Sequence, residues 1–253
     1  MDLIKKSIFK VINKLKMRLR REDFLTTPFS ILTSPIYIIR RGLYKEISRI
    51  APKIGGDILD FGCGQKPYET CFVNANTYIG VDILVSGHNH RSSKVDIFYD
   101  GKTLPFPDNS FDSVVSFEVL EHVFNLDEVL CEISRVLKPG GTFLMTVPFV
   151  WEEHEVPYDF ARYTSYGLVY KLKKNDYKIL ELLKSTTSIL AIGQLLVNYI
   201  ANNLLPRGRI LARFSQLLII FPLNLLIIFI NYILPKRYTL YCNSVVLCKN
   251  LKV

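Results

Sequence analysis

The chain contains 253 residues, of which 49% are hydrophobic, and carries a formal net charge of +9. This length suits one α/β domain with additions and is enough to bury a core. The five cysteines form no CxxC pair and no metal-ligand spacing with the four histidines. The composition therefore argues against a disulfide framework and a structural zinc site, and it predicts a reduced, cytoplasmic protein.

Two basic ends flank an acidic body. Residues 1–22 hold eight Lys and Arg against Asp2 and Glu22, a net charge of +6, and residues 182–253 hold eight Lys and Arg without an acid, a net charge of +8. The total of +9 leaves a net charge of −5 for residues 23–181. This distribution favours an anionic partner for the two ends rather than for the middle of the chain.

Residues 3–20 place apolar side chains at helical spacing, with lysines and arginines largely on the other faces. The pattern predicts a basic amphipathic helix that forms a first segment, residues 1–22. Lysines interrupt the apolar core that a secretory signal needs. The helix either packs on its own domain or lies on an anionic membrane surface. Because its basic residues are not interleaved with stacking aromatics, we expect no nucleic-acid partner.

A short buried strand, Asp57–Phe61, runs into a glycine turn. Gly62 and Gly64 allow a sharp turn whose backbone amides a ligand can approach. In a dinucleotide-binding turn a third glycine would occupy the position of Pro67, so a pyrophosphate loses support here and a phosphate-free nucleoside does not. A second strand, Tyr78–Asp82, ends in a carboxylate suited to a ribose diol.

Five motifs follow one another in a specific order. They are Leu59–Gly64, Gly80–Asp82, Leu104–Asp112, Glu118–His122 and Arg135–Gly141. This series resembles the class I S-adenosylmethionine-dependent methyltransferases of the type 11 kind, over about residues 55 to 185. The resemblance implies S-adenosyl-L-methionine as the cofactor and leaves the methyl acceptor open.

Strands alternate with helices along the chain. A helix is expected over residues 36–50 and another over 126–137, and further strands over 95–99, 113–117 and 142–147. Such alternation predicts an α/β fold whose parallel sheet is covered by helices on both faces. The resemblance implies a Rossmann-like methyltransferase fold: a mostly parallel, seven-stranded sheet with an antiparallel last strand near Tyr238–Cys248. The methyltransferase domain would span residues 36–253.

In parallel sheets ligands bind at the carboxyl ends of the strands. The candidate cofactor-binding residues are therefore Asp60, Gly62, Cys63, Gly64, Asp82, Ile83, Asp100, Gly101, Phe117 and Glu118. The resemblance places an acid near the adenine amino group at Asp100. Asp100-Gly101 is also an ordinary turn dipeptide, and Asp96 is the alternative acid if the third strand ends earlier.

Glu118, Glu121 and His122 are spaced i, i+3 and i+4, which would put them along one helix edge. Some related quinone methyltransferases use a similar cluster for a divalent metal. Departure of a methyl group from a sulfonium needs no Lewis acid, so we expect polar contacts at a helix start and no metal site.

Residues 148–164 follow the fifth strand and should overhang the cofactor. They hold the only Trp together with other aromatic and charged residues, a mixture suited to an acceptor pocket. His154, Asp159 and Arg162 are the candidate catalytic residues. His154 is the candidate base because the unperturbed pKa of histidine lies near neutrality, although a structural hydrogen bond is an equal alternative. Together with Gly64–Tyr68, this loop resembles the methyltransferases of bacterial surface-polysaccharide and lipopolysaccharide biosynthesis.

Residues 185–235 contain two uncharged runs, 185–206 and 214–235, separated by three arginines. If the last strand pairs with the strand near Tyr177–Leu183, the chain between them crosses a membrane twice or not at all. Polar residues in the first run and the connecting arginines disfavour two spans. We expect an insert that lies on the membrane, with Pro222 kinking a helix, in preference to a homodimer interface or a hairpin of two spans.

Together these patterns predict an S-adenosylmethionine-dependent methyltransferase of a cell-envelope glycan or lipid-linked sugar intermediate. It would be cytoplasmic and peripheral or monotopic on the inner face of the cytoplasmic membrane, with the anionic surface as a partner. Two alternatives remain open: methylation of an isoprenoid quinone or another lipid, and a cofactor-binding but inactive partner subunit.

Overall fold

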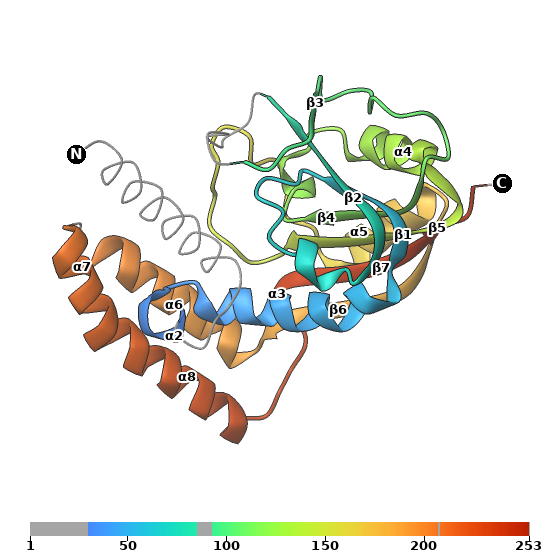
Figure 1. Cartoon of the computed structure of the whole chain (residues 1–253). Coiled ribbons are helices and arrows are strands. Elements are labelled where there is room, and N and C mark those ends of the chain that lie inside the picture. Colours follow the sequence, from blue (N-terminus) through green and yellow to red (C-terminus); the bar gives the residue numbers. More distant parts are fainter. Residues whose placement is uncertain (1–29, 85–92, 207, 253) are drawn as a thin grey trace, which may run out of the picture.

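A seven-stranded sheet forms the centre of the computed structural model, which describes residues 30–84, 93–206 and 208–252 (Figure 1). The expected helix over residues 1–22 lies outside this part of the chain. The strands are β1 (Gly55–Phe61), β2 (Asn74–Ile83), β3 (Ile97–Tyr99), β4 (Phe111–Phe117), β5 (Leu137–Pro148), β6 (Tyr177–Thr187) and β7 (Tyr241–Asn250). Their order across the sheet is β3-β2-β1-β4-β5-β7-β6.

The strand pairing confirms the predicted fold class. β1 pairs in parallel with β2 and β4, β2 with β3, and β4 with β5. β7 lies between β5 and β6 and pairs with both in antiparallel orientation, with Leu247 opposite Leu144 and Glu181. The last strand thus begins and ends slightly later than its predicted range, Tyr238–Cys248.

Helices cover both faces of the sheet. On one face lie α4 (Leu126–Val136) and α5 (Ser165–Lys174), whose buried residues pack with Leu59 and Val114. On the other face α3 (Tyr37–Ile50) packs its buried side chains, among them Ile47, against Ile58 and Val115. Adjacent strand residues such as Ile58 and Leu59 face opposite layers, as the period of a strand requires. Short helices occupy Ser30–Thr33 (α2), Ala51–Lys53 (η1), Glu69–Cys71 (η2) and Leu120–His122 (η4).

The apolar insert between β6 and β7 consists of α6 (Ile189–Asn203), α7 (Arg209–Ser215), a π-helical stretch η5 (Gln216–Ile220) and α8 (Phe221–Ile233). Pro222 stands in the first turn of α8, directly after the π-helical stretch. A proline has no backbone N–H to donate and crowds the carbonyl of the preceding turn, and a π-turn relieves that crowding.

The insert docks on the N-terminal part of α3 (Figure 1). Gln194 of α6 is fully buried; its Oε1 accepts from the Ile39 N–H at 3.0 Å and its Nε2 donates to the Pro35 carbonyl at 2.8 Å. A Cβ on Gly193 would lie 2.5 Å from Ile227 of α8, so the glycine allows the close approach of α6 and α8. This packing joins α6, α8 and α3 into one unit.

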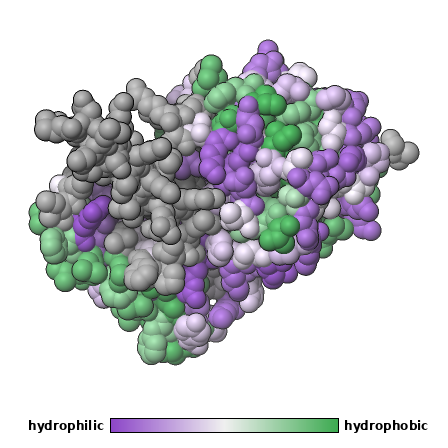
Figure 2. All heavy atoms as spheres, viewed as in Figure 1, coloured by the Kyte–Doolittle hydropathy of each residue, from purple (hydrophilic) through white to green (hydrophobic). Residues whose placement is uncertain are grey.

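The outer face of the insert is apolar. Exposed residues there include Leu218, Phe229 and Tyr232, and Figure 2 shows hydrophobic residues gathered over this end of the molecule. Among the described residues one helical stretch, Leu211–Ile233, is long and apolar enough by length and composition to cross a membrane. Because β6 and β7 are both strands of the central sheet, the insert leaves and rejoins the same body.

Candidate cofactor and acceptor site

The glycine turn after β1 is shaped by two backbone positions that favour glycine. Gly62 has φ 72° and Gly64 has φ 48°, values that residues with a side chain rarely adopt. A Cβ on Gly62 would lie 2.5 Å from the Val119 side chain, whereas a Cβ on Gly64 would meet nothing within 4 Å. Gly64 therefore leaves its backbone open to the neighbouring space, as a ligand loop requires.

Asp82, at the end of β2, accepts the Gly64 N–H at 3.0 Å through Oδ2 and the Ile83 N–H at 2.8 Å through Oδ1. The turn is fixed on its other side by Lys66, whose buried ammonium donates to the Tyr78 carbonyl at 3.1 Å and pairs with Asp96. The ion pair of Lys66 and Asp96 therefore holds the turn against β2.

Asp60 lies at the carboxyl end of β1 and is 1% exposed. Its carboxylate accepts the Tyr78 hydroxyl at 2.8 Å. Burial raises the pKa of Asp60 to about 7, because removal from water disfavours the charged form.

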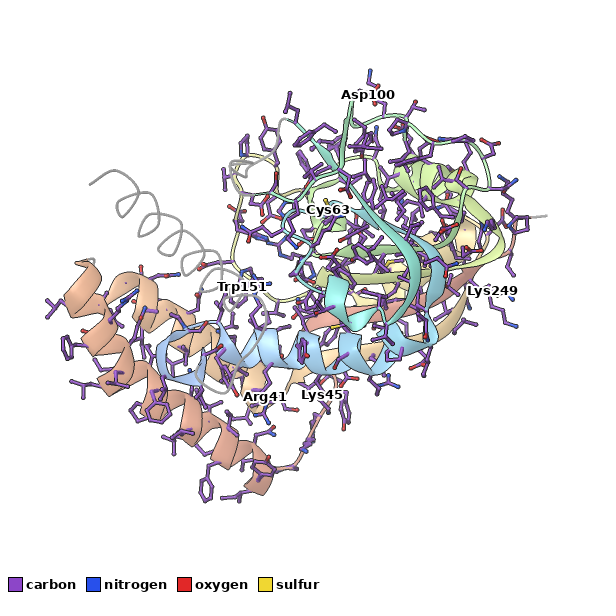
Figure 3. All side chains as sticks on the ribbon, in the orientation of Figure 1. Arg41, Lys45, Cys63, Asp100, Trp151 and Lys249 are labelled. Carbon is purple, nitrogen blue, oxygen red and sulfur yellow. The ribbon has the colours of Figure 1, made fainter. Side chains whose placement is uncertain are left out.

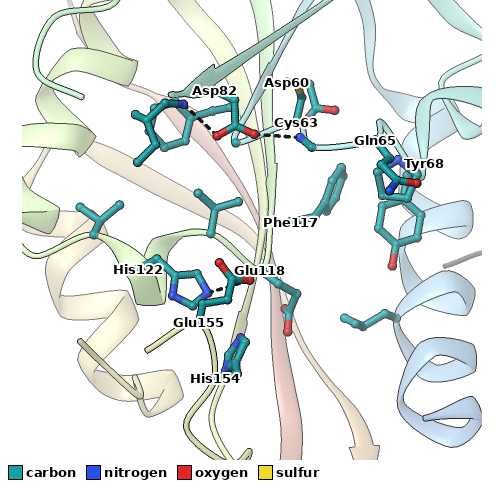
Figure 4. A pocket seen from close by; sticks show the side chains of 18 of the residues that line it. Asp60, Cys63, Gln65, Tyr68, Asp82, Phe117, Glu118, His122, His154 and Glu155 are labelled. Carbon is teal, nitrogen blue, oxygen red and sulfur yellow. Dashed lines mark hydrogen bonds and ion pairs between the residues drawn. The ribbon is translucent and has the colours of Figure 1, made fainter. Parts of the chain in front are cut away.

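One cavity of about 270 Å³ joins these residues to the loop after β5 (Figure 4). Eight of the ten candidate cofactor residues line it: Asp60, Gly62, Cys63, Gly64, Asp82, Ile83, Phe117 and Glu118. Asp100 and Gly101 are not part of the lining. Asp100 is exposed and accepts the backbone N–H groups of Lys102 and Thr103 at 2.8 and 3.0 Å, so it caps its own turn (Figure 3).

The predicted helix edge of Glu118, Glu121 and His122 is wrong. Glu118 has φ 55° in the turn that follows β4, and only Leu120–His122 form a short 3-10 helix. The reason is that the Glu118 N–H donates to the carbonyl of Thr146 on β5 at 3.1 Å, which holds this residue beside the sheet. Its Oε2 accepts from Asn243 Nδ2 at 2.6 Å, and burial raises the pKa of Glu118.

The loop after β5 carries the three candidate catalytic residues, and they occupy different positions. His154 lines the cavity, and Asp159 and Arg162 do not. The guanidinium of Arg162 forms two hydrogen bonds to Asp159, at 2.5 and 2.6 Å, and thereby lowers the pKa of Asp159 to about 2. Asp159 Oδ2 in turn accepts the backbone N–H of His154 at 2.9 Å. The ion pair thus fixes the loop that presents His154.

The lining of the cavity also includes residues that sequence reasoning missed. Ile36, Ile39, Arg40 and Leu43 contribute from α3. Trp151 packs against this helix and against α6 (Figure 3). The helical period of residues 36–50 indicates which side of α3 is apolar, but nothing in that pattern indicates that part of it borders a cavity.

The residues around the glycine turn fit S-adenosylmethionine. The space beside Gly64, which a side chain would fill, and the carboxylate of Asp82 would receive the nucleoside, since a carboxylate can accept both hydroxyls of a ribose diol. Tyr99 and Phe117 add aromatic surface to the same cavity. Pro67 lies in the lining where a pyrophosphate-binding turn would carry glycine.

Comparison with known proteins supports this assignment. Residues 59–145 match a family model described as a methyltransferase domain. A protein of Mycolicibacterium smegmatis named as a probable S-adenosylmethionine-dependent methyltransferase is 37% identical over 106 residues, covering 40% of this chain and 41% of that protein. The ubiquinone/menaquinone biosynthesis C-methyltransferase of Chromobacterium violaceum is 40% identical over 78 residues, covering 30% of this chain and 32% of its own.

The chain thus spans less than half of the length of these two relatives. Among solved structures, phosphoethanolamine N-methyltransferase 2 of Haemonchus contortus in complex with S-adenosyl-L-methionine is similar in fold, with a TM-score of 0.54 and 17% identity. The similarity covers 88% of this chain and 56% of that one. Residues 59–145 are therefore similar to a methyltransferase domain, and the chain has the Rossmann-like fold of a class I methyltransferase.

Proposed function

We propose that the protein transfers a methyl group from S-adenosylmethionine to a cell-envelope glycan or lipid-linked sugar intermediate at the inner face of the cytoplasmic membrane. The observation that carries this proposal is the cavity whose lining includes Gly64, Trp151 and His154. Its acceptor end is bordered by α3, and α3 is bonded to the apolar insert through Gln194.

The cofactor supplies a methyl group on a sulfonium, and the protein has to hold the acceptor in line with it. Correct positioning can provide most of the rate of such a displacement. A sugar hydroxyl must also lose its proton, and His154 is the candidate base because its ring borders the cavity. Arg162 and Asp159 would then act by fixing the position of His154.

The contact between the insert and the acceptor loop supports a membrane-anchored acceptor. Asn202 of α6 donates to Glu152 at 3.3 Å, and Trp151 packs with Ala191 of the same helix. An acceptor whose lipid part stays in the membrane beside the insert could therefore reach the cavity with its polar part. A glycan attached to a lipid has this composition.

An isoprenoid quinone is the second candidate acceptor. Similarity to a quinone C-methyltransferase favours it, and the same apolar surface would serve it. An inactive, cofactor-binding partner subunit is the third reading, and it predicts cofactor binding without turnover.

Mass spectrometry of cell-envelope and lipid extracts, incubated with S-adenosylmethionine with and without the protein, separates these possibilities. The proposal expects a mass increase of one methyl group in a glycan or glycolipid fraction. A methylated quinone would support the second candidate instead.

Once the acceptor is known and methyl transfer can be assayed, His154→Ala should lower turnover by about 10²-fold or more and leave the affinity for S-adenosylhomocysteine near that of the wild type. Equal loss of cofactor affinity would contradict the placement of His154 at the acceptor.

A further inference from the structure

The side chains of Glu121, His122 and His154 meet where the loop after β5 borders the cavity. Glu121 is 0% exposed, and within the part of the chain that the structure describes neither of its carboxylate oxygens has a hydrogen-bond partner. The Nε2 atoms of His122 and His154 lie 3.8 and 4.0 Å from Glu121 Oε1. A buried carboxylate with no partner is costly, so its position needs an explanation.

The opposite ring nitrogens of the two histidines are already engaged. His122 Nδ1 lies 2.9 Å from the Tyr158 carbonyl, which can only accept, so Nδ1 carries the proton in the neutral ring. His154 Nδ1 lies 3.3 Å from the Glu152 carbonyl and 3.3 Å from the Asp159 carboxylate. Arg162 Nη2 lies 3.4 Å from the same atom. His122 Nε2 therefore presents a lone pair to the carboxylate, and His154 Nε2 does so in the tautomer whose Nδ1 donates to Glu152.

Three electron-pair donors facing one another fit a bound cation. The three ligand atoms lie within 4.8 Å of one another. Bonds of about 2.0–2.2 Å to a divalent metal would require them to move together by only about 1 Å. Hydrogen bonds from a metal-binding imidazole to a carbonyl or carboxylate, as both rings make here, orient the ring for coordination. Glu118 is not one of the residues whose ligand atoms lie within 4.8 Å of one another, and its Oε2 accepts from Asn243 Nδ2.

Although the spacing of the sequence motif alone predicts no metal site, we propose that Glu121, His122 and His154 bind a divalent transition cation such as Zn²⁺. Two imidazoles and one carboxylate favour such a cation over Ca²⁺ or Mg²⁺, which prefer ligand sets made of oxygen. His122 and His154 both line the cavity, so the remaining coordination position opens toward it. Glu155, whose Oε1 lies 3.7 Å from His122 Nε2, borders the same space.

If the proposed function holds, that open position would bind an oxygen of the acceptor. His154 would then be a ligand and not a free base, since its Nε2 cannot serve both roles at once. The metal site itself does not depend on the identity of the acceptor.

Equilibrium dialysis of tag-free, chelator-treated protein against ZnCl₂, followed by elemental mass spectrometry, tests the site. We expect one bound zinc per chain, and Glu121→Gln should weaken binding by at least tenfold, the minimum lost when even an indirect partner of a metal ligand is removed. Glu153→Gln is the matched control, because Glu153 is exposed, precedes His154 and loses the same charge. Unchanged zinc binding by Glu121→Gln would overturn the proposal; this result is expected if cysteines hold the metal. Binding of less than one zinc per chain by the wild type would also overturn it.

Thermal unfolding distinguishes a lost ligand from a damaged fold. ZnCl₂ should raise the Tm of the wild type, because a ligand that binds the native state stabilises it. Without metal, Glu121→Gln should melt at or above the Tm of the wild type, since an amide replaces a buried, unpaired carboxylate. A Tm that rises with zinc in this variant as it does in the wild type would contradict the site.

Calorimetry with S-adenosylhomocysteine, run in parallel, keeps the two proposals apart. Cofactor binding without zinc binding refutes the metal site alone, and zinc binding without cofactor binding refutes the proposed function alone.

Discussion

Asp82 is the residue on which cofactor affinity should depend most clearly. It borders the cavity and also accepts the Gly64 N–H at 3.0 Å, so it holds the turn that a nucleoside would contact. Asp82→Ala should weaken S-adenosylhomocysteine binding by roughly 1.5–3 kcal/mol, the cost of a charge-assisted contact. Isothermal titration calorimetry measures this. Asp100→Ala is the comparison: affinity near that of the wild type is expected because Asp100 lies outside the cavity, and an equal loss would place it against the adenine after all.

The buried carboxyl of Asp60 should make stability depend on pH. Its pKa in the folded protein is about 7, against 3.8 for the unperturbed group. Between these values the folded state binds a proton that the unfolded state has lost, so the free energy of unfolding falls as pH rises from about 4 to 7, by up to ~1.4 kcal/mol per pH unit. Urea unfolding at pH 5 and pH 7.5 should show a smaller difference for Asp60→Asn than for the wild type. An identical difference would show that Asp60 is ionised throughout.

Among the elements, α6 should stabilise α3 through one buried side chain. Gln194 accepts from the Ile39 N–H in the first turn of α3, where the helix itself offers no acceptor. Gln194→Ala leaves that N–H and the Pro35 carbonyl without their partner, so unfolding free energy should fall by about 1–3 kcal/mol. Asn203→Ala, an exposed position on the same helix, should cost under about 0.5 kcal/mol. Chemical denaturation compares the two, and equal effects would mean that the buried contact contributes nothing.

The sequence predicts elements better than it predicts contacts between them. The periods of residues 36–50 and 126–137, and the strands around the glycine turn, follow from local hydrophobic patterns, and the motif order supplies the sheet topology. The approach of Gln194 to Ile39 joins positions 155 residues apart, and no local pattern encodes it. For the same reason the proximity of Glu121 and His154 could not be predicted, because it depends on how the loop after β5 folds back beside η4.

The whole molecule combines a body built around the seven-stranded sheet with an apolar end. Exposed apolar side chains gather on α8 and its neighbours, and the two ends of the sequence carry net charges of +6 and +8. Because β6 and β7 are neighbouring strands of the sheet, the insert begins and ends at the same body. We propose that its apolar face lies on a membrane. The insert would then bind by apolar burial, and the basic residues by attraction to anionic lipid.

We therefore expect the protein to sediment with vesicles containing anionic lipid at low salt. Deleting residues 1–22 should weaken this binding, since each basic residue near such a surface contributes on the order of 1 kcal/mol and salt screens the effect. High salt alone should not release the intact protein, because apolar burial does not depend on screening.

Replacing Leu218 and Phe229, 72% and 61% exposed on the insert, by serine should make binding reversible by salt. The same replacement of Val73 and Tyr166, 71% and 84% exposed on the catalytic body, is the control and should change little. Complete release of the wild type by salt would indicate that the apolar face is covered otherwise, and a concentration-dependent dimer in sedimentation equilibrium would then identify a second copy of the chain as its cover.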